Sequence, residues 1–336
     1  MIRKGIVIAG NVLTDNVKIV QSYPEKGMLA TIMEESIAVG GCVPNTAIDI
    51  KKIDKSVPVT VYGKIGKDEK GIFVKEQMKE VGIDVSGIKE SLTVPTSYSD
   101  VITEKYSGAR TFFHNRGANA EFCIDDVDVD NLDCKIFHIG YLMLLDWFDK
   151  LVDGNTGMAR LLKSVRDKGI KTSIDIVSES SGDFQKIVRC ALPYCDYAII
   201  NEIEACNVIG VEPRDKDGKL IEENIIYAMK QLMELGVKQK VIVHCPEKGY
   251  CIDKSGNLTL RDTLKLPNGF IKGSVGAGDA FCAGCLYSLY NDYKDDEMLD
   301  FASLVAASCL SEKDSISGVR DVEKLKKLFI EIKALS

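Results

Sequence analysis

The chain has 336 residues, of which 45% are hydrophobic, 28% are charged and 7% are aromatic. This composition is typical of soluble globular proteins, not of disordered or collagen-like chains. The net charge of −7 argues against a nucleic-acid or anionic-membrane partner, because such partners require a clustered basic surface. No stretch approaches the roughly 20 apolar residues of a membrane span. The length allows two domains, or one large core with a smaller accessory part.

The cysteines and the amino-terminal segment indicate where the chain resides. The opening MIRKGIVIAGN predicts a first strand and not a signal peptide, because its apolar run is too short. Eleven cysteines are scattered through apolar patterns, which favours free thiols in a cytoplasmic protein. Cys282 and Cys285 form a single CxxC within a predicted helix. We interpret them as buried small residues, with metal or redox chemistry as the alternative.

Short runs rich in Val and Ile alternate along the chain with amphipathic stretches of helical length. The predicted strands are Gly5–Ala9, Val57–Tyr62, Lys135–Ile139, Lys171–Ile176, Tyr197–Ile200 and Lys240–His244. The predicted helices include Asn45–Ile53, Glu69–Val81, Gly157–Lys168, Phe184–Leu192 and Ile221–Leu235. This alternation predicts an α/β fold with a doubly wound, mostly parallel sheet that is flanked by helices.

Two segments, 13–36 and 93–118, interrupt the alternation with polar, Thr- and Ser-bearing runs that read as strands. The second contains a predicted hairpin that turns at Ser107–Gly108. We therefore predict a small β-sheet lid from these segments, and a core formed by residues 1–12, 37–92 and 119–336. A sheet beside an active site commonly closes over it.

The stretch IKGSVGAGDAFCAG, residues 271–284, predicts a tight glycine-rich turn followed by a helical run from Ala280. Backbone N–H groups at a helix amino-terminus hold anions, so a phosphoryl group could bind at this turn. A carboxylate at the same turn, Asp279, could then remove the proton from an acceptor hydroxyl. The alternative is that Asp279 only caps the helix. No Gly-Lys-Ser/Thr follows, so this is not a Walker P-loop.

The segment GSVGAGDAFCAG resembles the carboxy-terminal signature of the ribokinase (PfkB) family of sugar and nucleoside kinases. Further segments resemble that family in the same order over nearly the whole chain. They are GNVLTD, GGCVPNTAIDIKKI, the run that begins YGKIGKDEKG, RGANAEF and NEIEA. Taken singly, Asp15 could be a turn residue, Asn45 a helix-start residue and Glu204 an exposed first-turn acid.

The resemblance implies an ATP-dependent kinase that phosphorylates a hydroxyl of a small sugar or sugar derivative, with Mg²⁺ as cofactor. It assigns the base to Asp279 and an anion hole to Gly276, Ala277 and Gly278, with the amide of Asp279. It places Asp15, Gly40, Gly41 and Asn45 at the sugar. It places Asn201, Glu204, Ser274 and Gly249 at the nucleotide and phosphates, with Glu204 reaching the metal through water or phosphate. A homodimer formed through the lid is also expected, since exposed sheet edges need covering.

The chain departs from the family pattern at several positions. Gly273 stands where relatives carry an aspartate near a monovalent cation, which leaves activation by potassium open. His244 and Pro246 replace the usual threonine and glycine near the nucleotide, and Ser303 replaces an asparagine near the adenine. The resemblance assigns no role to Asp175, at the predicted end of a strand.

The remaining histidines and arginines carry weaker signals. We interpret His138 as a core residue, because it lies in an apolar strand. His114 in the lid could approach the substrate, and Arg110 and Arg116 could contact an anionic one or simply be solvated.

Three rival functions remain open at this point. A nucleoside kinase would need a wall for the base, which Tyr98, Phe112 and Phe113 could form. A sugar- or nucleotide-binding regulator that lacks catalysis would fit Gly273 and Pro246. A nicotinamide-dependent dehydrogenase is disfavoured, because no G-x-G-x-x-G follows the first strand.

Overall fold

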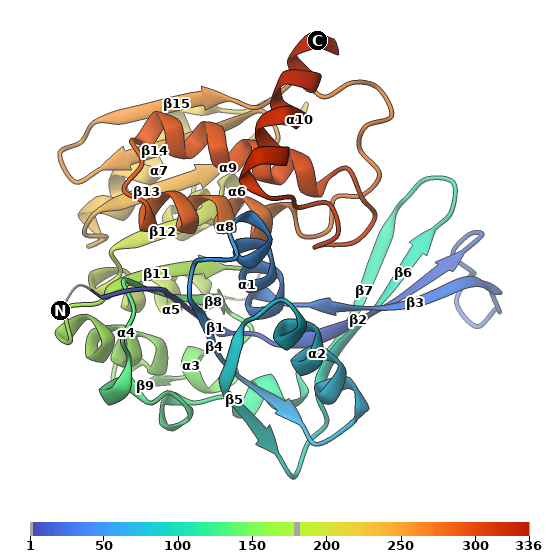
Figure 1. Cartoon of the computed structure of the whole chain (residues 1–336), viewed down its shortest axis with the longest axis horizontal. Helices are drawn as coiled ribbons and strands as arrows, with labels where there is room; N and C mark the ends of the chain where they lie inside the picture. The colour runs from blue at the N-terminus through green and yellow to red at the C-terminus, as the bar shows by residue number, and fades with distance from the viewer. Residues whose placement is uncertain (1–2, 178–181, 336) are drawn as a thin grey trace.

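A nine-stranded, mostly parallel sheet forms the centre of the computed structural model, which describes residues 3–177 and 182–335 (Figure 1). Its strands, in spatial order, are β15 (Leu258–Asp262), β14 (Lys248–Asp253), β13 (Lys240–His244), β12 (Tyr197–Asn201), β11 (Lys171–Ile176), β8 (Ile136–Leu142), β1 (Ile6–Gly10), β4 (Val59–Gly66) and β5 (Asp84–Ser91). Only the β13–β14 and β14–β15 pairs are antiparallel. The predicted doubly wound α/β architecture is therefore confirmed.

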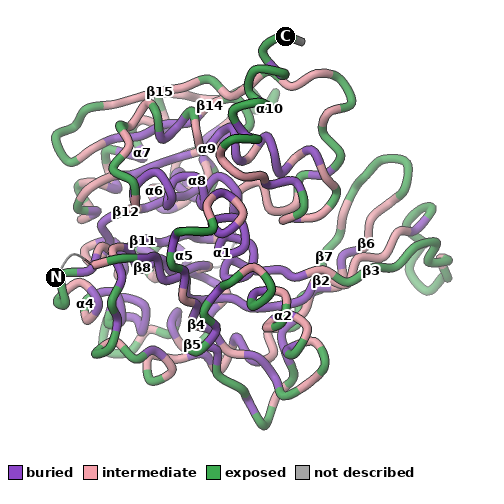
Figure 2. The backbone as a smooth tube through the Cα atoms, in the orientation of Figure 1, coloured by how far each residue is buried: buried purple, intermediate pink, exposed green. Residues whose placement is uncertain are grey.

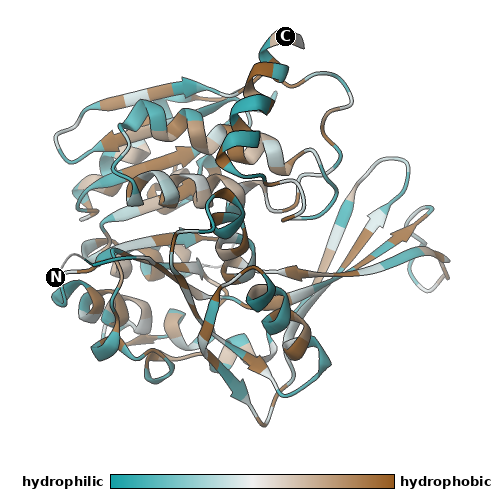
Figure 3. Ribbon diagram, viewed as in Figure 1, coloured by the Kyte–Doolittle hydropathy of each residue, from teal (hydrophilic) through white to brown (hydrophobic). Residues whose placement is uncertain are grey.

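Helices cover both faces of this sheet. The helices are α1 (Cys42–Ile53), α2 (Glu69–Glu80), α3 (Asp146–Asp149), α4 (Gly157–Asp167), α5 (Phe184–Ala191), α6 (Glu202–Ile209), α7 (Glu222–Glu234), α8 (Ala277–Tyr290), α9 (Asp295–Cys309) and α10 (Val322–Leu335). Alternate residues of β1 face opposite sides of the sheet. Ile6 and Ile8 join the apolar cluster under α1, α2, α8, α9 and α10. Val7 and Ala9 join the cluster on the other face, under α3 to α7. The apolar strands and helix faces meet in the buried interior (Figures 2 and 3).

A separate four-stranded sheet projects from this body (Figure 1). Its order is β3 (Ile32–Gly40), β2 (Leu13–Val20), β6 (Ser97–Glu104) and β7 (Arg110–Asn115). The predicted hairpin joins β6 to β7. Most of β3 and β7 is exposed (Figure 2). We call these four strands the projecting sheet.

Some element boundaries differ from the predicted ones for identifiable reasons. The first helix begins at Cys42 and not at Asn45, because Gly41 with φ of 89° ends the preceding strand and stands at the helix N-cap. The helix after the glycine-rich turn begins at Ala277 and not at Ala280, because Gly276 with φ of 78° turns the chain. The β14–β15 hairpin was not predicted, because the apolar run of β14 is only Tyr250–Ile252 and Thr259 separates the two leucines of β15. Within the described residues, every helix is too short or too polar to cross a membrane.

Candidate active site

The carboxylate of Asp279 lies in the first turn of α8 and is 6% exposed. Asn45 Nδ2 donates a hydrogen bond of 2.9 Å to Asp279 Oδ2, and the Tyr141 hydroxyl donates one of 2.6 Å to Oδ1. Burial raises the pKa of Asp279 to about 6, although the two hydrogen bonds act in the opposite direction and lower it. The side chain does not cap its helix, whose N-cap is Gly276. Asp279 is therefore a buried, oriented carboxylate that can accept a proton near neutral pH.

The turn before Asp279 presents free amides. The first hydrogen bond of α8 runs from Ala280 N to Gly276 O over 2.8 Å. The amides of Ala277, Gly278 and Asp279 precede it and have no acceptor within the helix. Three N–H groups at one helix amino-terminus form a ready site for phosphate oxygens.

This turn separates two pockets. Ser274, Ala277 and Gly278 line a pocket of about 670 Å³. Their neighbour Val275 lines a second pocket of about 250 Å³ under the projecting sheet, together with Asp15. Residues of one short turn therefore line both pockets.

Of the residues predicted at the sugar, Asp15 lines the smaller pocket, whereas Gly40, Gly41 and Asn45 are not among its described lining residues. A Cβ on Gly40 would lie 2.5 Å from Asp15 Oδ2, so only glycine leaves room for this carboxylate. Gly41 has φ of 89°, and a Cβ there would lie 2.7 Å from Asn11 O. Asn45 accepts a 2.9 Å hydrogen bond from Ser315 Oγ through its Oδ1, which orients its amide toward Asp279. Burial, and then the charge of Asp279, raise the pKa of Asp15 to about 7.

The larger pocket is mainly apolar. Its apolar lining consists of Ile203, Cys245, Pro246, Leu264, Leu266, Ile271, Ala277, Phe281, Ala306, Ala307 and Leu310. The ring of His244 lies against that of Phe281, with centroids 4.8 Å apart, and burial lowers the pKa of His244 to about 4, so this imidazole is neutral. The Ser303 hydroxyl has no hydrogen-bond partner among the described residues. Three of the four departures from the family pattern, His244, Pro246 and Ser303, line this pocket.

Asn201 and Glu204 meet at the start of α6, beside the larger pocket. Asn201 Oδ1 accepts from Glu204 N over 2.8 Å, and Glu204 Oε2 accepts from Asn201 N over 2.9 Å. Glu204 is only 4% exposed, so it is not the exposed first-turn acid of the alternative interpretation. The nearby Asp175 has a pKa well above its ordinary range because of burial and then the charge of Glu204. These carboxylate and amide oxygens are the ligand types that Mg²⁺ prefers.

The structure does not bring every predicted residue to a pocket. Gly249 lies in β14, where a Cβ would be 3.2 Å from Leu299 Cδ2, and it does not line the larger pocket among the described residues. His114 lies on β7 and pairs with Ser99 Oγ over 3.0 Å. Arg116 donates to Asp146 over 2.6 Å, an ion pair at the surface.

Sequence reasoning missed two residues that position the site. Tyr141 lies in the last part of β8, and its place at the carboxyl end of a parallel strand was a usable signal. Ser315 lies in the polar loop between α9 and α10, and no local pattern distinguishes it from its neighbours.

Comparisons with a family profile and with known proteins agree on one family. The profile of the family described as pfkB family carbohydrate kinase matches residues 3–321. The ribokinase of Arabidopsis thaliana is 22% identical over 325 residues, which are 96% of this chain and 80% of the relative. The adenosine kinase of Schizosaccharomyces pombe is 20% identical over 286 residues, which are 82% of this chain and 80% of the relative.

Solved structures support the fold. The ribokinase of Thermotoga maritima superposes with a TM-score of 0.79 at 20% identity, over 97% of this chain and 99% of the other. The ribokinase of Arabidopsis thaliana complexed with ribose and ATP gives 0.79 at 18% identity, over the same shares. Because the family match spans nearly the whole chain, the protein belongs to the pfkB family of carbohydrate kinases, which are phosphotransferases with an alcohol group as acceptor.

Proposed function

We propose that the protein transfers the γ-phosphoryl group of ATP to a hydroxyl, preferably a primary one, of a small uncharged sugar. The observation that carries this proposal is the position of the Ser274–Gly278 turn between the two pockets, with Asp279 directly after it. The larger pocket then holds ATP and the smaller one the sugar. The related ribokinase solved with ribose and ATP supports this pair of ligands.

In the proposed mechanism, Asp279 accepts the proton of the attacking hydroxyl while the amides of Ala277, Gly278 and Asp279 stabilise charge on the phosphoryl oxygens. Asn45 and Tyr141 hold the Asp279 carboxylate in one orientation before the sugar arrives. Asp15, Gly40, Gly41 and Asn45 orient the sugar. Gly276 allows the turn that aims the amides.

The apolar wall of the larger pocket suits a purine ring, and Ser274 and Asn201 lie where the phosphates would extend. Mg²⁺, when bound, neutralises phosphate charge. Glu204 would act on it through water or phosphate. Gly249 supports the wall from behind, through Leu299 and Phe281. Gly273 leaves no room for a carboxylate, since a Cβ there would lie 2.8 Å from Lys313 O, so we expect no monovalent-cation site of the family type.

The charge of the smaller pocket favours a substrate without a phosphate or carboxylate group. Among the described residues, Asp15, Glu34, Glu35 and Asp314 line it against one cation, Lys313. Arg116, a candidate for an anionic substrate, is engaged by Asp146. None of the described residues that line this pocket is aromatic, which favours a sugar over a nucleoside.

Segments 13–36 and 93–118 are proposed to act as a lid that closes over the sugar and excludes water. The projecting sheet exposes apolar side chains, which supports a homodimer formed through it. These side chains are Ile32, Met33, Ile37, Phe112 and Phe113. The eleven cysteines are all unpaired, which supports a reducing compartment such as the cytoplasm.

An ADP-release assay with Mg-ATP against a sugar panel tests the function. We expect turnover with one or more free pentoses or hexoses. Their phosphorylated forms and sugar acids should have kcat/KM at least about 100-fold lower, because like charges in one pocket cost several kcal/mol. Nucleosides serve as the comparison for the rival function. A clear preference for a sugar phosphate, or for a nucleoside, would contradict the proposal.

The dependence of the rate on pH follows from the two carboxylates. Asp279, with a pKa of about 6, must be ionised to accept a proton, and Asp15, with a pKa of about 7, must be ionised to accept hydrogen bonds from sugar hydroxyls. We expect kcat/KM to fall as the pH drops through 7, and log kcat/KM to approach a slope of about 2 below pH 6. Initial rates between about pH 5 and pH 9 measure this. A rate that stays constant down to pH 5 would exclude both groups.

A further inference from the structure

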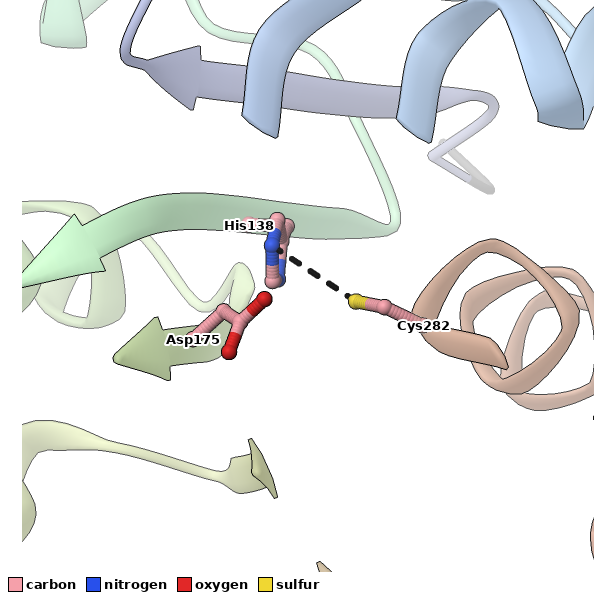
Figure 4. A group of neighbouring side chains, drawn as sticks. All are labelled: His138, Asp175 and Cys282. Carbon is pink, nitrogen blue, oxygen red and sulfur yellow. Dashed lines mark hydrogen bonds between the residues drawn. The ribbon is translucent and has the colours of Figure 1, made fainter. Parts of the chain in front are cut away.

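Three side chains of metal-ligand type gather behind the proposed active site (Figure 4). His138 comes from β8, Asp175 from β11 and Cys282 from α8. Their ligand atoms all lie within 4.8 Å of one another, and all three residues are buried. Core packing alone does not require a histidine, a carboxylate and a thiol to converge from three separate elements.

The contacts of His138 give this group its geometry. Its Nε2 lies 3.7 Å from Cys282 Sγ and 3.5 Å from Cys42 Sγ. Its Nδ1 lies 3.0 Å from Ser173 Oγ. When Nδ1–H donates to Ser173, the Nε2 lone pair points at the two sulfurs. A metal-binding histidine is commonly oriented in this way, by a hydrogen bond from its other ring nitrogen.

One lone pair cannot accept hydrogen bonds from two thiols at once, so hydrogen bonding explains only one of the two S···N contacts. A tetrahedral zinc ion explains both. With Zn–S near 2.3 Å and Zn–N near 2.1 Å, the N···S separation is about 3.5 Å. The observed 3.5 and 3.7 Å match this value.

We propose that His138 Nε2, Cys282 Sγ and a carboxylate oxygen of Asp175 bind one Zn²⁺. Cys42 Sγ lies 3.5 Å from His138 Nε2 but outside the group whose ligand atoms all lie within 4.8 Å of one another, so it becomes the fourth ligand through a shift of its side chain. On binding, each thiol and any protonated carboxyl releases its proton to solvent as the metal–ligand bond forms. Thiolate and imidazole ligands select a borderline-soft ion such as Zn²⁺ and not Mg²⁺, so this site is distinct from the one at the phosphates.

The bound ion would join four elements that carry the active site. Cys42 follows Gly41 at the start of α1, and Cys282 comes three residues after Asp279 in α8. His138 and Asp175 belong to adjacent strands of the central sheet. The zinc ion would thus fix both helix amino-termini to the sheet.

Co²⁺ is a suitable probe, because cobalt bound to thiolate in a four-coordinate site gives charge-transfer and visible bands that Zn²⁺ does not. The reduced, metal-free chain is titrated with Co²⁺, and each addition is followed until the absorbance is constant, since a buried site exchanges slowly. We expect saturation at one cobalt per chain, and loss of the bands when Zn²⁺ is added.

Two variants identify the ligand set. Cys282→Ser should weaken Co²⁺ binding at least tenfold and reduce the charge-transfer band. Cys285→Ser is the matched control, because Cys285 is equally buried in the same helix but lies near Cys251. Equal binding by both variants would overturn the proposal. If Cys282→Ser does not fold, the unmutated chain still decides the matter, since the absence of saturable four-coordinate bands means that the cluster only forms hydrogen bonds.

Discussion

Asp279→Asn is expected to lower kcat by about 10³-fold while sugar and ATP still bind, because a positioned general base contributes about 10² to 10⁴ to the rate. The change removes the proton acceptor but keeps the volume of the side chain. Its amide can accept from Asn45 through Oδ1 and donate to the Tyr141 hydroxyl, which can turn to receive it. Turnover is measured with ADP release, and binding with calorimetry.

The same substitution is expected to stabilise the folded chain. Burial raises the pKa of Asp279 from about 4 to about 6, so the folded state holds this proton more tightly than the unfolded state. The stability that this provides is present below about pH 4 and is lost as the pH rises to about 6. At pH 8 the ionised carboxylate therefore costs up to about 3 kcal/mol, and the neutral amide removes this cost. Thermal unfolding at pH 8 measures the gain.

Asp149→Asn is a matched control for both effects. Asp149 lies in α3, where burial also raises its pKa to about 6, and its Oδ2 accepts a 2.9 Å hydrogen bond from Leu145 N. Loss of its charge should change stability but leave kcat within about twofold. If Asp279→Asn keeps more than about a tenth of the turnover, Asp279 is not the base. If the unmutated chain binds sugar and ATP without turnover, the protein is a binding regulator and not a kinase.

Local patterns predicted the fold because most of its central strands carry Val and Ile at buried positions. Lys240–His244, a Val-Ile-Val run between polar residues, was predicted with the observed boundaries, and so was Lys171–Ile176, whose apolar residues are Ile174 and Ile176. β15, at the edge of the sheet, carries less of this signal, because none of its five residues is buried. Periodicity therefore predicts buried parallel strands better than the antiparallel edge of a sheet.

The candidate site was predicted only where a local motif exists. Gly276 and Asp279 belong to one turn, so their spacing alone suggested an anion site beside a carboxylate. The partners of that carboxylate are distant in sequence: Asn45 by 234 positions and Tyr141 by 138. Topology brings them together, and no window of the sequence contains that information.

The position of the main chain at residues 312–313 is another feature that no window of the sequence contains. It occupies the space beside Gly273 that an aspartate side chain would need. The sequence indicated that a carboxylate is missing, but only the packing explains why one does not fit.

Gly276→Ala is expected to lower kcat by at least about 100-fold and the free energy of unfolding by about 3 kcal/mol. Gly276 has φ of 78°, a conformation that costs a residue with a Cβ about 1–2 kcal/mol. The new Cβ would also lie 2.4 Å from Ser315 Cβ, and such overpacking costs about 1–3 kcal/mol. Activity and urea unfolding measure the two effects.

Gly276→Ala is expected to lower activity more than its loss of stability alone would, because the residue that it displaces, Ser315, holds the base Asp279 in place. Ser315 Oγ donates to Asn45 Oδ1, and Asn45 Nδ2 donates to Asp279 Oδ2. A shift of Ser315 therefore reaches the carboxylate through two hydrogen bonds, and a displacement of about 1 Å at a reacting group can cost 10² in rate.

Gly269→Ala separates this effect from backbone strain. Gly269 has the same φ of 78°, but a Cβ there would meet no atom within 4 Å. It should lose only about 1–2 kcal/mol of stability and keep its kcat. If both variants lose the same activity, backbone strain in the segment before α8 is the cause. If only Gly276→Ala loses activity, the contact between the turn and Ser315 is what keeps Asp279 in position.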